Sequence, residues 1–276
     1  MAAEEVIADF ATPPVVEVVT AVRFSPMRQE TFLAFASFWR DTWRDDFPGF
    51  ELQGPYESPV ERFSDGAPQA PTLSFEFPPV MLLPRVWASS ADGQHLLQVQ
   101  RDWFAANWRR HGGVSDVTYP HWPARRTEFK QRWAEFSGWL EAQGETPDSI
   151  QCEVTYINHI APVEGIWSSH GEVARVLPGL SVGADLPVRA EQAALRSQYV
   201  VDAEGDLPQA RLHVSLTPAF GGPGEPKPIY VLELTVRGAP ASDGDLGKFG
   251  DRARRVIVES FISITSSELR MAWGQK

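Results

Sequence analysis

The feature that most constrains this fold is an alternation of apolar and polar residues with a period of two. It is clearest in residues 15–24, where Val18 and Phe24 share one face and Glu17 lies on the other. Side chains alternate across a strand, so this pattern, rich in β-branched residues, predicts half-buried strands. The other predicted strands are 50–57, 72–77, 84–89, 94–101, 150–160, 193–201, 209–216 and 229–237.

Other stretches change to the helical period. In residues 29–46, Phe32, Phe35 and Trp39 are spaced so that they form one apolar stripe. The Pro48-Gly49 pair ends this helix. The other predicted helices are 125–143, a short one near 171–178, and 246–272. Strands and helices in this order predict an α+β fold.

Composition agrees with a folded globular chain. The 276 residues are 43% hydrophobic and 22% charged, which suits one large domain or two of roughly 130 residues. With 25 Lys and Arg against 36 Asp and Glu, the net charge is −11. This acidity argues against general nucleic-acid or anionic-membrane binding, since both need positive surface. No membrane helix is expected, because no apolar run approaches the roughly 18 residues required.

The single cysteine, Cys152, excludes an internal disulfide and a cysteine cluster for zinc, as is usual in the cytoplasm. Residues 1–5 contain neither a basic nor an apolar stretch, so we expect no secretory signal and a cytoplasmic protein. Cys152 shares a strand face with Val154 and Tyr156. We therefore expect a buried, inert thiol.

Two pairs of segments indicate an internal repeat of about half the chain length. Residues 17–26 parallel residues 153–162. At nearly the same separation, residues 95–99 parallel residues 230–234. Such spacing is typical of a tandem duplication. The alternative is that alternating strands resemble one another by chance.

The predicted fold is therefore α+β with two similar half-domains, each a curved antiparallel sheet packed on a long helix. The expected divisions are a flexible N-terminus at 1–12, a first half at 13–144 and a second half at 145–276. This order of elements resembles the TATA-binding-protein-like, helix-grip architecture. The resemblance concerns the fold alone, and the acidic charge argues against the DNA-binding use of that architecture.

Three motifs occur together in this chain, and both their order and their spacing are characteristic. They are Pro13-Pro14-Val15-Val16-Glu17-Val18, Tyr156-Ile157-Asn158-His159-Ile160, and the ending Phe261…Ile264-Thr265…Trp273. Over nearly the whole chain they resemble a sporadically distributed family of uncharacterised bacterial proteins. That family usually carries Arg where this chain has His159. The resemblance implies no activity. The patchy occurrence of the family implies exchange by mobile elements, as with defence or toxin–antitoxin genes.

The sequence contains no pattern for a metal centre or a catalytic nucleophile. No histidine lies three or four positions from another histidine, or from a well-placed Asp or Glu on a predicted helix, and there is no His-Glu-x-x-His motif. A Gly-x-Ser-x-Gly elbow is missing. The glycine-rich run 221–224 lacks the Lys-Ser/Thr ending of a phosphate-binding loop. We therefore predict no metal and no cofactor, and we assign no catalytic residue.

Aromatic and basic residues gather in segment 102–124, which we expect to be irregular. Its candidate binding residues are Trp103, Trp108, Arg109, Arg110 and Trp122. One interpretation is that the aromatic side chains pin a long loop to the sheet and the arginines cover them. The other is a recognition surface, because Trp and Arg are frequent interface anchors.

Polar residues on strand faces are the second set of candidates. Asn158 lies on the expected buried face of its strand, where it must bond to the protein or meet a ligand. Glu17 and Arg23 lie on the opposite face of the first predicted strand. Glu153 and His159 hold the corresponding positions in the second half. These four could line a shared polar cleft, or form a solvated face with cross-strand charge pairs.

Two functions follow as alternatives. The first is a non-catalytic binding or regulatory protein that acts through protein contacts, in a bacterial defence or toxin–antitoxin setting. The second is a small-molecule binder, or an enzyme without a visible motif, that uses a cleft between helix and sheet. A deep pocket lined by Glu17, Arg23, Asn158 or His159 favours the ligand, whereas a flat exposed aromatic patch favours a partner protein.

Self-association is a further expectation, because a free sheet edge must be covered, blunted or paired. Residues 230–236 are free of proline and rich in β-branched residues, so we expect an edge that can pair with a second copy or a partner. Pro78, Pro79 and Pro84 blunt the other expected edge. Segment 102–124 is the alternative interface.

Overall fold

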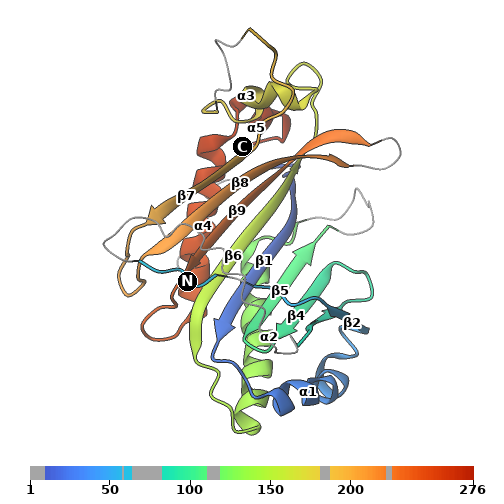
Figure 1. Ribbon diagram of the computed structural model, residues 1–276, viewed down its shortest axis with the longest axis vertical. Helices are drawn as coiled ribbons and strands as arrows, with labels where there is room; N and C mark the ends of the chain where they lie inside the picture. The colour runs from blue at the N-terminus through green and yellow to red at the C-terminus, as the bar shows by residue number, and fades with distance from the viewer. Residues whose placement is uncertain (1–9, 58, 64–82, 111–118, 181–186, 222–225) are drawn as a thin grey trace.

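One antiparallel sheet dominates the fold (Figure 1). The computed structural model describes residues 10–57, 59–63, 83–110, 119–180, 187–221 and 226–276. Within these residues, nine strands follow the order β2-β3-β4-β5-β1-β6-β9-β8-β7 across the sheet. The α+β class and the antiparallel sheet are thus confirmed. In the described part of the chain, no helix has both the length and the apolar character needed to span a membrane.

The elements follow the chain in this order. The strands are β1 (Val15–Phe24), β2 (Gly49–Gln53), β3 (Arg85–Ser89), β4 (His95–Gln100), β5 (Trp103–Arg109), β6 (Ser149–Ile160), β7 (Leu195–Val201), β8 (Ala210–Gly221) and β9 (Lys227–Gly238). The helices are α1 (Gln29–Phe38), α2 (Trp122–Ala142), α3 (Val173–Val176), α4 (Leu246–Ile264) and α5 (Ser267–Ala272). A π-helical turn, η1 (Trp39–Trp43), follows α1, and a 3₁₀ turn, η2 (His170–Glu172), precedes α3.

The two predicted halves meet at the centre of this sheet. Strands β1 to β5 come from the first half and β6 to β9 from the second, and β1 pairs with β6. The halves therefore share one sheet. Their equivalence as duplicated half-domains stays a prediction. Residues 95–99 lie in β4, which is separated from β1 by β5, whereas residues 230–234 lie in β9, directly beside β6. These two segments do not hold equivalent places.

Helices α2 and α4 cover one face of the sheet. Helix α2 packs on β1 and β5, while α4 packs on β6 and β9 and also contacts α2; both lie behind the strands in Figure 1. In the core between these layers, Phe104 stacks on Phe136 with 5.6 Å between ring centroids. Val154 and Ile257 are buried there as well. Burial of each such side chain contributes roughly 1.5–3 kcal/mol, which holds the helices to the sheet.

Side chains define both ends of α4. The Asp245 carboxylate accepts a hydrogen bond from a backbone N–H of the first turn at 2.8 Å. At the other end, the Thr265 hydroxyl donates to the Phe261 carbonyl at 2.6 Å, and Ser266 caps α5. The prediction of one helix over 246–272 was therefore wrong at this break.

Two predictions about strands were also wrong. Residues 103–109 form the inner strand β5 instead of an irregular segment, because burial on both faces removes the period-two pattern. Residues 230–236 are not an edge, since β9 is hydrogen-bonded to β6 and to β8. The edges of the described sheet are β2 and β7. The predicted strand 72–77, Pro78 and Pro79 lie outside the described residues.

The face of the sheet opposite the helices is called the polar face here. It carries buried polar residues such as Gln98 on β4, Asn107 on β5, and Glu153 and Thr155 on β6. A segment without regular structure, residues 55–57 and 59–63, lies across this face and is called the strap. Its contacts reach from β4 to β8.

Candidate functional site

A pocket lies between the helices and the sheet, where the start of α2 approaches α4. Its volume is about 690 Å³ including its open mouth. Strand β6, both helices and the segment before β1 form its walls. The aromatic side chains of the walls that come from outside the sheet are Phe10, Tyr119, His121, Trp122 and Phe261. Of the four residues expected to line such a pocket, Asn158 does so, whereas Glu17, Arg23 and His159 are not among its described lining residues.

Tyr156 contacts two other polar side chains of the pocket wall, Tyr119 and Arg254. The hydroxyl of Tyr156, on β6, lies 2.9 Å from the hydroxyl of Tyr119. Burial raises the pKa of Tyr156 well above its ordinary value, Tyr119 raises it further, and a hydrogen bond from Arg254 acts in the opposite direction. The Tyr156 hydroxyl is therefore protonated at neutral pH and can donate or accept a hydrogen bond.

Asn158 also lines the pocket, on the same face of β6 as Tyr156. Its side-chain nitrogen donates to the Leu232 carbonyl at 3.1 Å. The residue is thus bonded to backbone, and this bond fixes the amide in the pocket wall. The Trp122 indole donates to Asp251 Oδ1 at 2.8 Å, which fixes the ring at the junction of α2 and α4.

The chemistry of the lining is amphipathic. The rings of Phe10, Trp122 and Phe261 offer contact to an apolar body. Arg254 supplies a positive charge, and Tyr156 and Asn158 add hydrogen-bonding groups. Such a lining can hold and orient a small molecule. Among the described residues of the lining there is no Ser, Thr or Cys beside a base.

The structure separates the predicted aromatic binding residues. Trp103 and Trp108 are buried on β5 and face opposite sides of the sheet. Trp103 packs on Tyr56 of the strap, with 5.2 Å between centroids, and Trp108 packs on Tyr119 at 5.3 Å. Trp122 is buried at the start of α2. These tryptophans do not form one exposed surface.

The two predicted arginines hold the end of β5. The Arg109 side chain donates to the Gly93 carbonyl at 2.9 Å, and its guanidinium lies 5.7 Å from the centre of the Trp87 ring. The backbone N–H of Arg110 donates to the Val16 carbonyl at 2.6 Å. A recognition role for these arginines stays a prediction.

Alternation placed four further candidates on the polar face: Glu17, Arg23, Glu153 and His159. Two of them form separate ion pairs. Arg23 pairs with Asp102 at 2.7 Å, and Glu153 pairs with Arg237. Partial burial lowers the pKa of His159, which favours its neutral form. The four side chains share a face. The Glu153–Arg237 pair joins β6 to β9 and fits the alternative of cross-strand pairs, whereas Arg23 pairs with a residue of the turn between β4 and β5.

A chain of hydrogen bonds crosses four strands and ends at Glu17. The Trp87 indole donates to Gln98 at 3.0 Å, and Gln98 donates to Asn107 at 2.9 Å. Asn107 donates to the Glu17 carboxylate at 2.5 Å. Burial raises the pKa of Glu17 and outweighs the lowering by Asn107 and Arg109. The fold therefore favours the protonated form of this side chain.

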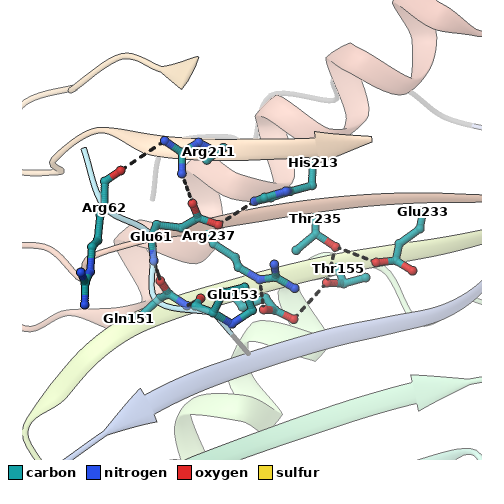
Figure 2. A network of polar contacts seen from close by, with 11 residues as sticks. Glu61, Arg62, Gln151, Glu153, Thr155, Arg211, His213, Glu233, Thr235 and Arg237 are labelled. Carbon is teal, nitrogen blue, oxygen red and sulfur yellow. Dashed lines mark hydrogen bonds and ion pairs between the residues drawn. The ribbon is translucent and has the colours of Figure 1, made fainter. Parts of the chain in front are cut away.

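A second network joins the strap to β6, β8 and β9 (Figure 2). The Glu61 carboxylate pairs with Arg211 and lies 2.6 Å from His213 Nε2. Burial raises the pKa of Glu61, but the bonds to His213 and Arg211 outweigh burial, so the pKa lies below its ordinary value. Beside this cluster, the hydroxyls of Thr155 and Thr235 lie 2.8 Å apart.

Sequence reasoning missed this second network. Alternation in residues 209–216 could have placed Arg211 and His213 on one face of β8. Glu61, however, comes from a segment without periodicity, and it lies 150 positions from Arg211 in the sequence. No local pattern predicts such a contact.

Possible metal ligands and the Cys152 thiol are the remaining groups relevant to metal binding or catalysis. Within the described ranges, no three His, Cys, Asp or Glu side chains gather as metal ligands. Burial raises the pKa of the Cys152 thiol to about 12. This thiol therefore carries almost no thiolate at neutral pH.

Comparison of the chain with family models, with curated proteins and with solved structures finds no match. The resemblance to a bacterial family and to the helix-grip architecture stays a prediction.

Proposed function

We propose that this protein binds a small amphipathic molecule in the pocket between α2, α4 and β6. The observation that carries this proposal is the lining, in which aromatic side chains and Arg254, Tyr156 and Asn158 surround the pocket. Sites for small molecules are typically apolar clefts with a few placed polar groups. A flat apolar body with one carboxylate or other anionic group fits this lining best.

Two observations support a ligand over a partner protein as the occupant of this side of the molecule. Asn158, a predicted binding residue, lines the pocket. Trp108 and Trp122 are buried, so they supply no flat aromatic patch. A bacterial defence setting and a cytoplasmic location stay predictions.

The test uses anilinonaphthalene sulfonate, a fluorescent probe with an aromatic body and one anionic group. We expect the protein to bind this probe with a rise in fluorescence. Val258 lines the pocket, so Val258→Trp should fill it and weaken binding roughly tenfold or more. Arg254→Gln should weaken binding too, because the sulfonate loses its cation.

The matched control is Glu259→Trp, which adds the same indole to an exposed position of α4. It should bind the probe like the unchanged protein. Circular dichroism must show that each variant is folded, because partly unfolded chains also bind this probe. Equal probe affinity for Val258→Trp and Glu259→Trp would contradict the proposal. If the probe binds, native mass spectrometry of protein from its host can identify the natural ligand.

A further inference from the structure

The strap is held on the polar face through its own backbone. Gln100 accepts from the Tyr56 N–H at 2.8 Å and donates to the Tyr56 carbonyl at 3.1 Å. Gln151 accepts from the Glu61 N–H at 2.7 Å and donates to the Pro59 carbonyl at 3.1 Å. Each glutamine amide thus bonds to the strap as the peptide groups of a neighbouring strand would. An extended segment is the natural occupant of such donors and acceptors.

Two side chains of the strap fill defined places. The Tyr56 ring packs on Trp103, with 5.2 Å between centroids. The Glu61 carboxylate is 6% exposed and bonds to Arg211 and His213 (Figure 2). The polar face therefore recognises an aromatic residue followed, five positions later, by a carboxylate.

The basic part of this site depends on the strap for its counter-charge. Among the residues that the structure describes, Glu61 is the one carboxylate in contact with Arg211 or His213. Glu153, in the same network, pairs with Arg237 (Figure 2). An arginine and a histidine fixed on one strand are a ready site for a carboxylate, because charged hydrogen bonds to such donors are strong.

We propose that the polar face is a binding surface for an extended acidic segment of a partner protein, and that the strap occupies this surface in cis. The partner segment places its carboxylate on Arg211 and His213, its aromatic side chain on Trp103, and its backbone on Gln100 and Gln151. The strap can leave the surface without breaking the sheet, because side chains rather than a strand ladder hold it. As a tethered occupant it has a high effective concentration, so the partner binds when the strap is weakened.

This surface and the pocket lie on opposite faces of the sheet. The inference is therefore independent of the proposed ligand. Its failure would leave the pocket untouched, and probe binding in the pocket is not expected to change when the strap is weakened.

The test measures binding of a fluorescent peptide with the sequence of residues 54–63 to the full-length protein by fluorescence anisotropy. In the double variant Tyr56→Ala/Glu61→Gln the strap loses both side-chain anchors. We expect this variant to bind the peptide roughly tenfold or more tightly than the unchanged protein does. Adding Arg211→Gln, or replacing the glutamate of the peptide that corresponds to Glu61 by glutamine, should abolish the gain.

Asp41→Asn is the matched control, because it removes an exposed carboxylate that pairs with Arg40; it should give no gain. Circular dichroism establishes that the double variant is folded, and Glu61→Gln alone takes its place if it is not. The inference is overturned if the folded variant binds the peptide no more tightly than the unchanged protein. A gain that does not depend on the glutamate of the peptide overturns it equally.

Discussion

At the scale of single residues, Glu17 is held in a way that disfavours its charge. It lies at the end of the hydrogen-bond chain from Trp87 and accepts from Asn107. Within the described part of the chain, no Lys, Arg or His lies within ion-pair distance of this carboxylate. Burial raises its pKa, against the opposing effects of Asn107 and Arg109. Because the folded state binds the proton more tightly than the unfolded state, the contribution of Glu17 to stability falls as pH rises above about 4.5, the ordinary pKa value.

Glu17→Gln tests this directly. Glutamine keeps an acceptor for Asn107 and removes the buried charge, so we expect the variant to unfold at a higher urea concentration at pH 7. The gain should shrink as pH falls toward 4.5, because the wild-type carboxyl is then protonated in the folded state. Urea titrations at several pH values measure this. Glu51→Gln, at an exposed position of β2, is the control and should change little; a loss of stability for Glu17→Gln at pH 7 would contradict the argument.

Residue positions could be predicted from sequence only as far as alternation reaches. It placed Glu17, Arg23 and Asn158 on the correct faces of their strands. It could not assign their partners, because Asn107 lies on a strand without alternation. The burial of Trp103 and Trp108 could not be predicted for the same reason: both faces of β5 are covered, so the strand shows no alternation.

At the scale of elements, the contact between α2 and α4 depends on a small residue. Gly250 of α4 lies under the Trp122 ring, and a Cβ placed there would lie 2.8 Å from a ring carbon. The ring has little freedom to move, because it is buried and its nitrogen bonds to Asp251 at 2.8 Å. The close approach of the two helices at the pocket therefore requires glycine.

We expect Gly250→Ala to destabilise the protein by about 1–3 kcal/mol, the usual effect of overpacking a well-packed site. Gly138→Ala is the matched control on α2, where a Cβ meets nothing within 4 Å. Alanine there should stabilise by roughly 0.5–1 kcal/mol, because it is the better helix former. Thermal unfolding of both variants measures the difference. Equal melting temperatures for the two variants would contradict this prediction, because they would show that α2 and α4 can move apart without loss of stability.

The elements themselves were more predictable than their ends. Strands β1, β6, β8 and β9 and the long helix α2 follow clear periods in the sequence. The break between α4 and α5 was missed because two hydroxyl side chains, Thr265 and Ser266, make it without glycine or proline. Such a break depends on where the backbone carbonyls lie in space.

At the scale of the whole molecule, the sheet joins both halves of the chain through the β1–β6 pair. These strands are bonded from Val15–Asn158 to Phe24–Ser149. Neither half contains all the neighbours of its inner strand. Alternation cannot reveal this, because it assigns a strand to a face and not to a neighbour.

Separate expression of residues 10–144 and 145–276 tests the unity of the sheet. We expect neither fragment alone to unfold cooperatively, because the cut exposes the inner edges of β1 and β6 and part of the core beneath α2 and α4. Circular dichroism during heating measures this, with the intact chain as the reference. A cooperative transition in each isolated fragment would instead support two independent half-domains.

The glutamine bonds to the strap have a consequence for how this segment can diverge among descendants of the chain. Gln100 and Gln151 grip peptide groups, which every amino acid carries, and Glu57 and Val60 between the anchors are exposed. Substitutions at Glu57 and Val60 are therefore expected to be tolerated. A change of length is not, because one inserted or deleted residue would move the carboxylate of Glu61 away from the guanidinium of Arg211.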